Sequence, residues 1–168
     1  MKIRDATEAD VPAIVDIYNA AVASRQSTAD TEPVSVESRR RWLRDRDSAT
    51  RPVWVVEVDG VVAAWFSFEP FHSRPAYSIT AEVSVYVAAD YRRRGIARRM
   101  LQEAARRSPS MGVRTLVAVV FLHNEPSLAL FEGLGFQRWG HLPRVTELDG
   151  IERDVVILGL RVDEAGAG

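Results

Sequence analysis

Residues 82–97 read Glu-Val-Ser-Val-Tyr-Val-Ala-Ala-Asp-Tyr-Arg-Arg-Arg-Gly-Ile-Ala, and this stretch decides the fold. Its first part, from Val83 to Val87, is β-branched and aromatic, which predicts a largely buried strand. Three consecutive arginines and Gly95 follow, where a helix N-terminus would expose its N–H groups among positive charges. The helix itself is predicted by apolar residues that recur three to four positions apart: Ile96, Ala97, Met100, Leu101, Ala104 and Ala105. The stretch therefore predicts an anion site, most simply for a phosphate or pyrophosphate; a surface arginine run that caps a helix is the alternative.

The composition is typical of one globular domain. The chain has 168 residues, of which 46% are hydrophobic and 27% charged, and its net charge of −1 gives no indication of a nucleic-acid or anionic-membrane partner. The absence of cysteine excludes disulfides, a thiolate nucleophile and cysteine-based metal sites. The three histidines, His72, His123 and His141, lack the short spacing of metal ligands, so no metal is expected. Without an apolar signal region or membrane span, we expect a cytoplasmic protein.

Hydrophobic periodicity and turn residues predict the order β-α-α-β-β-β-α-β-α-β-β. The firmest local prediction is a hairpin that pairs residues 53–58 with residues 61–68 around Asp59-Gly60. The other predicted elements are a strand at 2–5, a helix from Asp10, a helix from Ser35 through Arg46, a helix to Arg107, a strand at 115–121, a helix opened by Asn124, and final strands at 136–146 and 151–162. This pattern indicates a single mixed α/β domain over residues 1–162, with a disordered tail at 163–168.

The motif Arg92-x-x-Gly95-x-Ala97 after an apolar strand resembles the (Gln/Arg)-x-x-Gly-x-(Gly/Ala) signature of the GNAT superfamily of acyl-CoA-dependent N-acetyltransferases. The predicted order of elements is also that of the GNAT fold. Further segments are similar to the phosphinothricin and methionine sulfoximine acetyltransferase branch: Ile3-Arg4-x-Ala6-Thr7-x-x-Asp10, Ile17-Tyr18-Asn19, residues 28–33, Arg74-Pro75-Ala76-Tyr77, Asn124-x-Pro126-Ser127 and Leu134-Gly135-Phe136. Several independent matches in the right order cover most of the chain.

The resemblance implies acetyl-CoA as the acetyl donor and assigns residues to it. Backbone N–H groups of the arginine loop would hold the pyrophosphate, and the residues implied are Arg92, Arg93, Arg94, Gly95, Ile96, Ala97 and Arg98. In the family the preceding strand splays from its neighbour, so the main chains of Val85, Tyr86 and Val87 would bind pantetheine, with an N–H near Val85 as oxyanion donor. Asn124 and Ser127 would contact the pantetheine and phosphate arm. As alternatives, the three strand residues are simply sheet core and Asn124 is a helix cap.

The resemblance also implies the groups that act on the acceptor. Glu82 matches the glutamate that deprotonates the substrate ammonium as general base, and partial burial would raise its pKa to a useful value; a strand-end glutamate that faces solvent is the alternative. Arg74 and Tyr77 would border the acceptor, with the arginine on a carboxylate. Thr28 and Glu32 would form the opposite wall.

One departure concerns the leaving thiolate. Many GNAT enzymes place a tyrosine on the helix after the asparagine to protonate it, and the aligned residue here is Phe131, which cannot donate a proton. Water, Tyr86 or His123 could substitute, or the thiolate could leave unprotonated, given a thiol pKa of about 8.5.

The leading hypothesis is an N-acetyltransferase that acts on a small amino-acid-like amine by direct attack, with a homodimer expected from the resemblance. A second hypothesis changes the acceptor to a protein N-terminus, a lysine side chain or an aminoglycoside. A third is a CoA-binding module with weak or lost catalysis, for which Phe131 is the best support and Glu82 the counter-argument. A nucleic-acid role for the arginines at 92–107 is the least favoured, since acidic residues are interspersed and the net charge is near zero.

Overall fold

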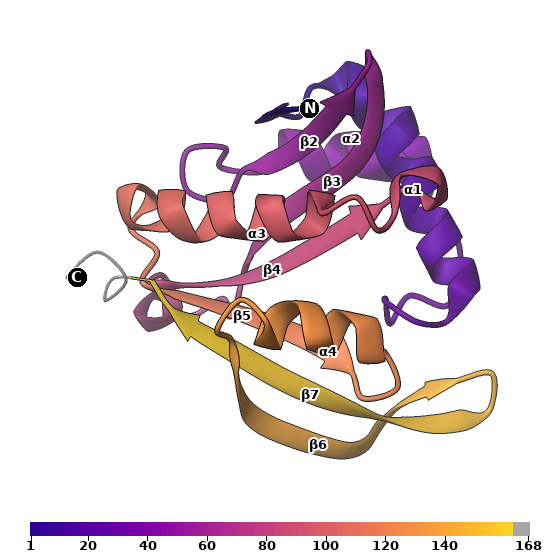
Figure 1. Cartoon of the computed structure of the whole chain (residues 1–168), viewed down its shortest axis with the longest axis vertical. Coiled ribbons are helices and arrows are strands. Elements are labelled where there is room, and N and C mark those ends of the chain that lie inside the picture. The colour runs from indigo at the N-terminus through magenta and orange to yellow at the C-terminus, as the bar shows by residue number, and fades with distance from the viewer. Residues whose placement is uncertain (163–168) are drawn as a thin grey trace.

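The computed structural model describes residues 1–162, which form one seven-stranded mixed sheet with helices on both faces (Figure 1). The sheet order is β1-β2-β3-β4-β5-β7-β6. The strands are β1 (Lys2–Asp5), β2 (Val53–Val58), β3 (Val61–Pro70), β4 (Thr80–Val87), β5 (Thr115–Phe121), β6 (Gln137–Leu148) and β7 (Ile151–Arg161). The helices are α1 (Val11–Ser24), α2 (Val36–Arg44), α3 (Ile96–Arg107) and α4 (Glu125–Glu132). The predicted order of elements is confirmed.

The β2–β3 hairpin forms at the predicted two-residue turn. Asp59 and Gly60 both have positive φ, 50° and 80°, which matches the right-handed twist of the flanking strands. Other boundaries differ by a few residues. β3 continues to Pro70 because β4 pairs with it along its whole length, and β6 extends to Leu148 through two register shifts against β7. The predicted tail, residues 163–168, lies outside the described residues, and the domain boundary at residue 162 stays a prediction.

Alternation along β4 assigns its side chains to the two faces of the sheet. Odd-numbered residues such as Val83 and Val85 join the larger core beneath α3 and α4, together with Phe66 and Phe68 of β3. Even-numbered residues face α1 and α2, where Tyr86 contacts a second core around Trp65 and Tyr18. Figure 1 shows α3 and α4 on the near face of the sheet, α2 behind β2 and β3, and α1 running down the right-hand side of the view. Glu82 and Ser84 therefore lie on the α1–α2 face.

No helix within residues 1–162 has the length and apolar character needed to cross a membrane.

Candidate active site

β4 and β5 are paired only at their beginnings. Their parallel ladder joins Thr80 to Thr115, Ala81 to Leu116 and Glu82 to Val117, and ends there, although β4 continues to Val87 and β5 to Phe121. Figure 1 shows the two strands diverging beyond this point, with α3 and α4 on either side of the gap. Because backbone groups need partners, an unpaired edge inside a sheet is a place where a ligand can add hydrogen bonds. The splay that the family resemblance implied is present.

The register against β3 shows which main-chain groups of β4 face this gap. The N–H of Ala88 donates to the carbonyl of Ala63 over 2.9 Å, so even-numbered residues of β4 exchange hydrogen bonds with β3. The odd-numbered residues consequently direct their N–H and C=O groups to the open edge. Val85 and Val87 present main-chain groups there, whereas those of Tyr86 are directed to Trp65 on β3. Of the three predicted pantetheine contacts, two have the required main-chain orientation.

The arginine loop forms a concave run of N–H groups before α3. Arg93 and Gly95 both have positive φ, 58° and 76°, and Gly95 is the N-terminal cap of the helix. A glycine cap has no side chain to bond the first N–H groups of the helix, so these stay available to an anion. A Cβ added at Gly95 would meet nothing within 4 Å, which leaves room above the loop for a bound group. These features fit the pyrophosphate of acetyl-CoA.

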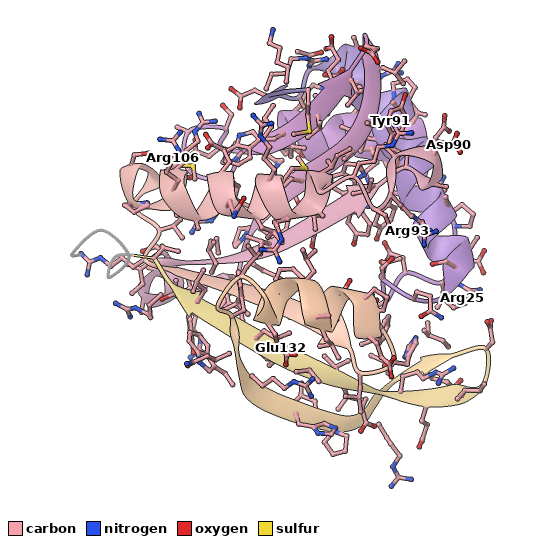
Figure 2. The ribbon with its side chains drawn as sticks, in the orientation of Figure 1. Arg25, Asp90, Tyr91, Arg93, Arg106 and Glu132 are labelled. Carbon is pink, nitrogen blue, oxygen red and sulfur yellow. The ribbon has the colours of Figure 1, made fainter. Side chains whose placement is uncertain are left out.

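The arginines of this loop are exposed. Arg92, Arg93, Arg94 and Arg98 all lie at the surface, and Arg92 reaches back to the carbonyl of Val87 over 3.5 Å. Figure 2 shows Arg93 on the side of the molecule where β4 and β5 diverge. Ile96 is different, because its side chain is 3% exposed within the core. Only the main chain of Ile96 can contact a ligand, while Ala97 is half-buried beside it.

A cleft of about 320 Å³ runs through the gap between β4 and β5. On the α3–α4 face its lining includes Asn124, Ser127 and Phe131, and on the α1–α2 face Thr28 and Glu82. Residues from both faces line one cavity, so a donor and an acceptor can approach each other from opposite sides of the sheet. Asn124 caps α4 by accepting from the N–H of Ser127 over 3.3 Å, and its predicted capping role is confirmed.

Glu82 has an electrostatic environment suited to a base. Burial raises its pKa, and the charge of Glu69, directly opposite on β3, raises it further. Glu69 itself is paired with Arg46 over 2.7 Å, whereas Glu82 has no hydrogen-bond or ion-pair partner within residues 1–162. Glu82 lies near the beginning of β4, half-buried and lining the cleft, and not at the end of the strand.

The predicted acceptor residues are divided between two places. Thr28 is buried and lines the cleft with Glu82, but Glu32 is exposed and outside its lining. Arg74 and Tyr77 line a second pocket, formed by the end of α2, the 45–51 loop and the β3–β4 connection. This pocket shares no lining residue with the first within the described chain. The structure therefore brings Thr28 and Glu82 together in one cleft. Arg74 and Tyr77 line a second pocket that also includes Glu69, directly opposite Glu82 on β3, and Glu32 lies outside the lining of the cleft.

The residues considered as proton donors to the leaving thiolate do not all lie in the cleft. Phe131 lines the cleft and packs against Phe136, so the position aligned with the family tyrosine does border the gap. Tyr86 lines the cleft as well, and burial raises its pKa, which keeps its hydroxyl protonated. His123 is not in the lining; its Nε2–H donates to the carbonyl of Arg25 over 3.0 Å.

Arg25, at the end of α1, connects the segments that surround His123 at one end of the cleft. Its Nε donates to Asp149 in the β6–β7 turn over 3.0 Å, and its Nη1 donates to the carbonyl of Thr31 over 2.9 Å. Figure 2 shows Arg25 where α1 ends, on the same side of the molecule as Arg93. Arg25 thus joins segments far apart in sequence around one end of the cleft.

Several cleft residues had no role assigned from the sequence, among them Tyr18, Asp30, Ser84 and Val119. Tyr18 and Asp30 meet at the wall formed by the α1–α2 connection, Ser84 lies between Glu82 and Tyr86, and Val119 of β5 is 45% exposed. Tyr18, Asp30 and Ser84 stood within segments matched to the family, and that was the signal that could have indicated them.

A cleft that opens on both faces of a splayed sheet, beside the glycine-capped N-terminus of α3, suits an enzyme that brings two ligands together. The sequence profile of the acetyltransferase (GNAT) family matches residues 14–136. The chain belongs to the GNAT acetyltransferase family, whose N-acetyltransferases use acetyl-CoA.

The names of individual relatives agree with this family assignment. YwnH of Bacillus subtilis (strain 168), whose name assigns it provisionally as a phosphinothricin acetyltransferase, is 49% identical over 95% of this chain and 98% of its own. L-amino acid N-acyltransferase MnaT of Escherichia coli (strain K12) is 34% identical over 98% of this chain and 95% of its own. The crystal structure of a phosphinothricin acetyltransferase from Sinorhizobium meliloti in complex with acetyl-CoA superposes with a TM-score of 0.91 at 26% identity, covering 99% of this chain and 91% of that one.

Proposed function

We propose that this enzyme transfers the acetyl group of acetyl-CoA to the amine of a small amino-acid-like acceptor, with Glu82 as general base. The observation that carries the proposal is the single cleft through the splayed sheet, which joins Glu82 on one face to Asn124 and Ser127 on the other. The names of relatives support the acceptor class, because they include an L-amino acid N-acyltransferase and L-methionine sulfoximine/L-methionine sulfone acetyltransferases.

Acetyl-CoA supplies the activated acetyl group, and the residues of the chain position it and manage protons. The N–H groups at the start of α3 hold the pyrophosphate, and Val85 and Val87 bond the pantetheine along the open edge. The N–H of Val85 donates to the carbonyl oxygen that becomes negative as the amine attacks. Glu82 takes the proton from the acceptor ammonium, and its raised pKa makes it a stronger base than an ordinary glutamate. The thiolate then leaves unprotonated or takes a proton from water, because the raised pKa of Tyr86 makes its hydroxyl a weak acid.

The decisive experiment mixes the purified enzyme and acetyl-CoA with a panel of amines and measures thiol release. The panel contains amino acids, phosphinothricin, methionine sulfoximine, an N-terminal peptide, a lysine peptide and an aminoglycoside. We expect turnover with the amino-acid-like members. Faster turnover of a peptide or the aminoglycoside would replace the acceptor class, and acetyl-CoA binding without any thiol release would favour a binding module instead.

A separate experiment tests the proposed role of Glu82 as general base. Glu82→Gln removes the proton acceptor, so we expect turnover at pH 7 to fall by about 10²- to 10⁴-fold. Acetyl-CoA binding, followed by calorimetry, should stay near the wild-type value because the donor contacts are on the opposite face. Unchanged turnover across the pH range would remove Glu82 from the mechanism.

The homodimer and the cytoplasmic location expected from the sequence belong to the same proposal. The homodimer rests on the resemblance, and size-exclusion chromatography with light scattering tests it. Fractionation of the native host tests the location.

A further inference from the structure

The acceptor side of the cleft has two walls that come from distant parts of the chain. Residues 27–30 of the α1–α2 connection form one wall, and Thr146 and Val155 of the β6–β7 hairpin form the other. Glu82 lines the cleft on the same face of the sheet. Because the two walls are not continuous in sequence, the width of the opening between them depends on contacts across its rim.

The side chain of Arg25 joins the two walls at one end of the cleft. Its Nε donates to Oδ2 of Asp149 in the β6–β7 turn over 3.0 Å, so this ion pair reaches from one wall to the other. Its Nη1 donates to the carbonyl of Thr31 over 2.9 Å, and this bond closes residues 27–30 into a loop. Arg25, Thr31 and Asp149 all lie outside the lining of the cleft, at its rim.

The main chain of Arg25 is held by β5, the strand beneath the cleft. The Nε2–H of His123 donates to the carbonyl of Arg25 over 3.0 Å, and the ring of His123 stacks on Phe121 with 5.1 Å between the ring centroids. Phe121 belongs to β5 and lines the cleft. Arg25 is therefore fixed to the sheet by its main chain and to both walls by its side chain.

The backbone of Arg25 has a conformation that glycine adopts more easily. Arg25 caps the C-terminus of α1 with φ 57° and ψ 24°, in the left-handed region where helices usually end on glycine. A residue with a Cβ adopts this conformation at an energetic cost, which persists where the surrounding contacts outweigh it. The bonds of the guanidinium are such contacts, so the side chain rather than the backbone explains an arginine here.

We infer that Arg25 and Asp149 are positioning residues that set the width of the acceptor entrance, the opening between the two walls. This inference rests on the proposed function and deepens it. With 32% and 64% of their side chains exposed, the pair contributes little to stability. It instead orders the walls before the acceptor binds, so without it acceptor binding must order them at a cost in affinity. A loosened entrance also admits bulkier acceptors.

The width of the entrance can be measured without any activity, because the chain has no cysteine. Spin labels on Glu32→Cys and Ile151→Cys, both exposed and outside the cleft lining, report the distance between the walls. An excess of unlabelled protein restricts the measurement to distances within one chain. We expect a narrow distance distribution in the labelled parent and a broader one in Arg25→Gln; equal distributions overturn the inference.

The control for this measurement is Arg144→Gln. Arg144 pairs with Glu152 over 3.5 Å within the β6–β7 hairpin, so its loss removes an exposed ion pair that does not join the walls. We expect the label distances to stay as in the parent. Equal broadening in Arg144→Gln and Arg25→Gln would mean that the hairpin loosens with any lost charge, and overturns the inference.

The effect on transfer is measured with L-methionine sulfoximine as acceptor. We expect Arg25→Gln and Asp149→Asn each to raise its KM by about two- to fivefold, as suits a partly exposed ion pair, with kcat and the KM of acetyl-CoA unchanged. The double variant should have a KM close to those of the single variants, because the same pair is lost in each. The ratio of kcat/KM for L-tryptophan over L-methionine sulfoximine should rise, whereas Glu152→Gln should leave both acceptors unchanged.

Arg25→Gly separates positioning from folding. Glycine relieves the left-handed backbone while the side chain is lost, so we expect a melting temperature near that of wild type together with the raised acceptor KM of Arg25→Gln. A lowered melting temperature with a reduced kcat would mean that Arg25 serves the fold instead, and overturns the inference.

The outcomes distinguish the inference from the proposed function on which it rests. An unchanged acceptor KM and an unchanged tryptophan ratio in Arg25→Gln overturn the role of the pair, while transfer by the wild type stands. A wild type that releases no thiol with any amine overturns the proposed function, and the label distances still show whether Arg25 and Asp149 hold the walls.

Discussion

Glu82 and Glu69 lie directly opposite each other across the β3–β4 ladder, and only one of them has a counter-charge. Arg46, whose side chain is 8% exposed, pairs with Glu69 over 2.7 Å. Directly opposite residues of an antiparallel pair project to the same face, so two carboxylates share the α1–α2 side of the sheet. Because Arg46 compensates Glu69 and nothing compensates Glu82, it is the pKa of Glu82 that is raised, by burial and by the charge of Glu69.

Removing Glu69 should make Glu82 a weaker base. As the proposed general base, Glu82 would act when ionised, so kcat/KM should decline as pH falls through its raised pKa. Glu69→Gln removes a like charge and leaves Arg46 uncompensated, and both changes lower that pKa. We therefore expect the acidic limb of the kcat/KM profile to move to lower pH. Glu147→Gln, on the exposed β6, is the control; an unmoved limb in Glu69→Gln would show that another group titrates.

Replacing Glu82, the proposed base, should stabilise the fold. A carboxyl with a raised pKa binds its proton more tightly folded than unfolded, so ionisation costs stability as pH rises from the ordinary glutamate range through the raised value. Glu82→Gln removes this cost at pH 7. We expect its melting temperature to exceed that of wild type by a few degrees, since ~1 kcal/mol corresponds to ~2–4 °C in a domain of this size. At pH 4 the difference should vanish; a less stable variant at pH 7 contradicts the argument.

Gly95 can be tested against Gly60, a glycine with nearly the same backbone. Both have positive φ, 76° and 80°, and a Cβ on either would meet nothing within 4 Å. Alanine at either position therefore costs about 1–2 kcal/mol of stability through backbone strain. Only at Gly95 would the added atom approach the proposed pyrophosphate site, so we expect Gly95→Ala to raise the KM of acetyl-CoA and Gly60→Ala to leave it unchanged. Equal values in both variants would place the donor elsewhere.

The ion pair of Arg4 and Asp10 links β1 to the start of α1. It is bidentate, with distances of 2.7 and 2.8 Å, and the N–H of Thr7 also donates to Asp10. The bond from Arg4 holds the pKa of Asp10 below its ordinary value despite burial. The stabilisation is complete above the ordinary aspartate pKa of about 4 and is lost as pH falls below it.

Asp10→Asn should therefore cost about 2 kcal/mol at pH 7, and less as the pH is lowered. Urea unfolding at pH 7 and pH 3 measures both values. Asp16→Asn, an exposed carboxylate on the same helix, should change stability little at either pH. A loss in Asp10→Asn that does not depend on pH would mean that packing rather than charge is responsible.

The order of elements was predictable because its signals are local. Asp59-Gly60 alone specifies the hairpin turn, and the β-branched and aromatic residues at 83–87 indicate a strand without reference to distant residues. The signal for the arginine loop was also local, because a glycine between a strand and an apolar periodic segment marks the start of α3.

The acceptor wall was not predictable, because it depends on contacts between distant residues. Asp30 rather than Glu32 lines the cleft, since the hydroxyl of Tyr18, twelve residues earlier, bonds Asp30. The family resemblance implied that Arg74 and Tyr77 border the acceptor, and this stays a prediction. In the structure they line a pocket beneath α2 that also includes Glu69, the residue opposite Glu82 on β3. Side-chain direction in a loop is set by such tertiary partners.

The ring of Trp139 on β6 leaves no room for a side chain at Gly159 of β7. A register shift between Arg138 and Gly140 leaves Trp139 unpaired, and its ring lies over Gly159. A Cβ at Gly159 would come within 1.9 to 2.3 Å of three ring carbons, closer than any real contact. Gly159→Ala should therefore displace the indole and cost about 1–3 kcal/mol.

Three matched variants distinguish this clash from a general intolerance of β6–β7. Gly140→Ala is the control, because its Cβ would lie 3.8 Å from Ile157, an ordinary contact. Trp139→Ala alone should cost little, since the indole is 49% exposed. In Gly159→Ala/Trp139→Ala the clash is absent, so urea unfolding should show the double variant more stable than Gly159→Ala. Additive losses would mean that the glycine is required by the backbone of β7 and not by the ring that covers it.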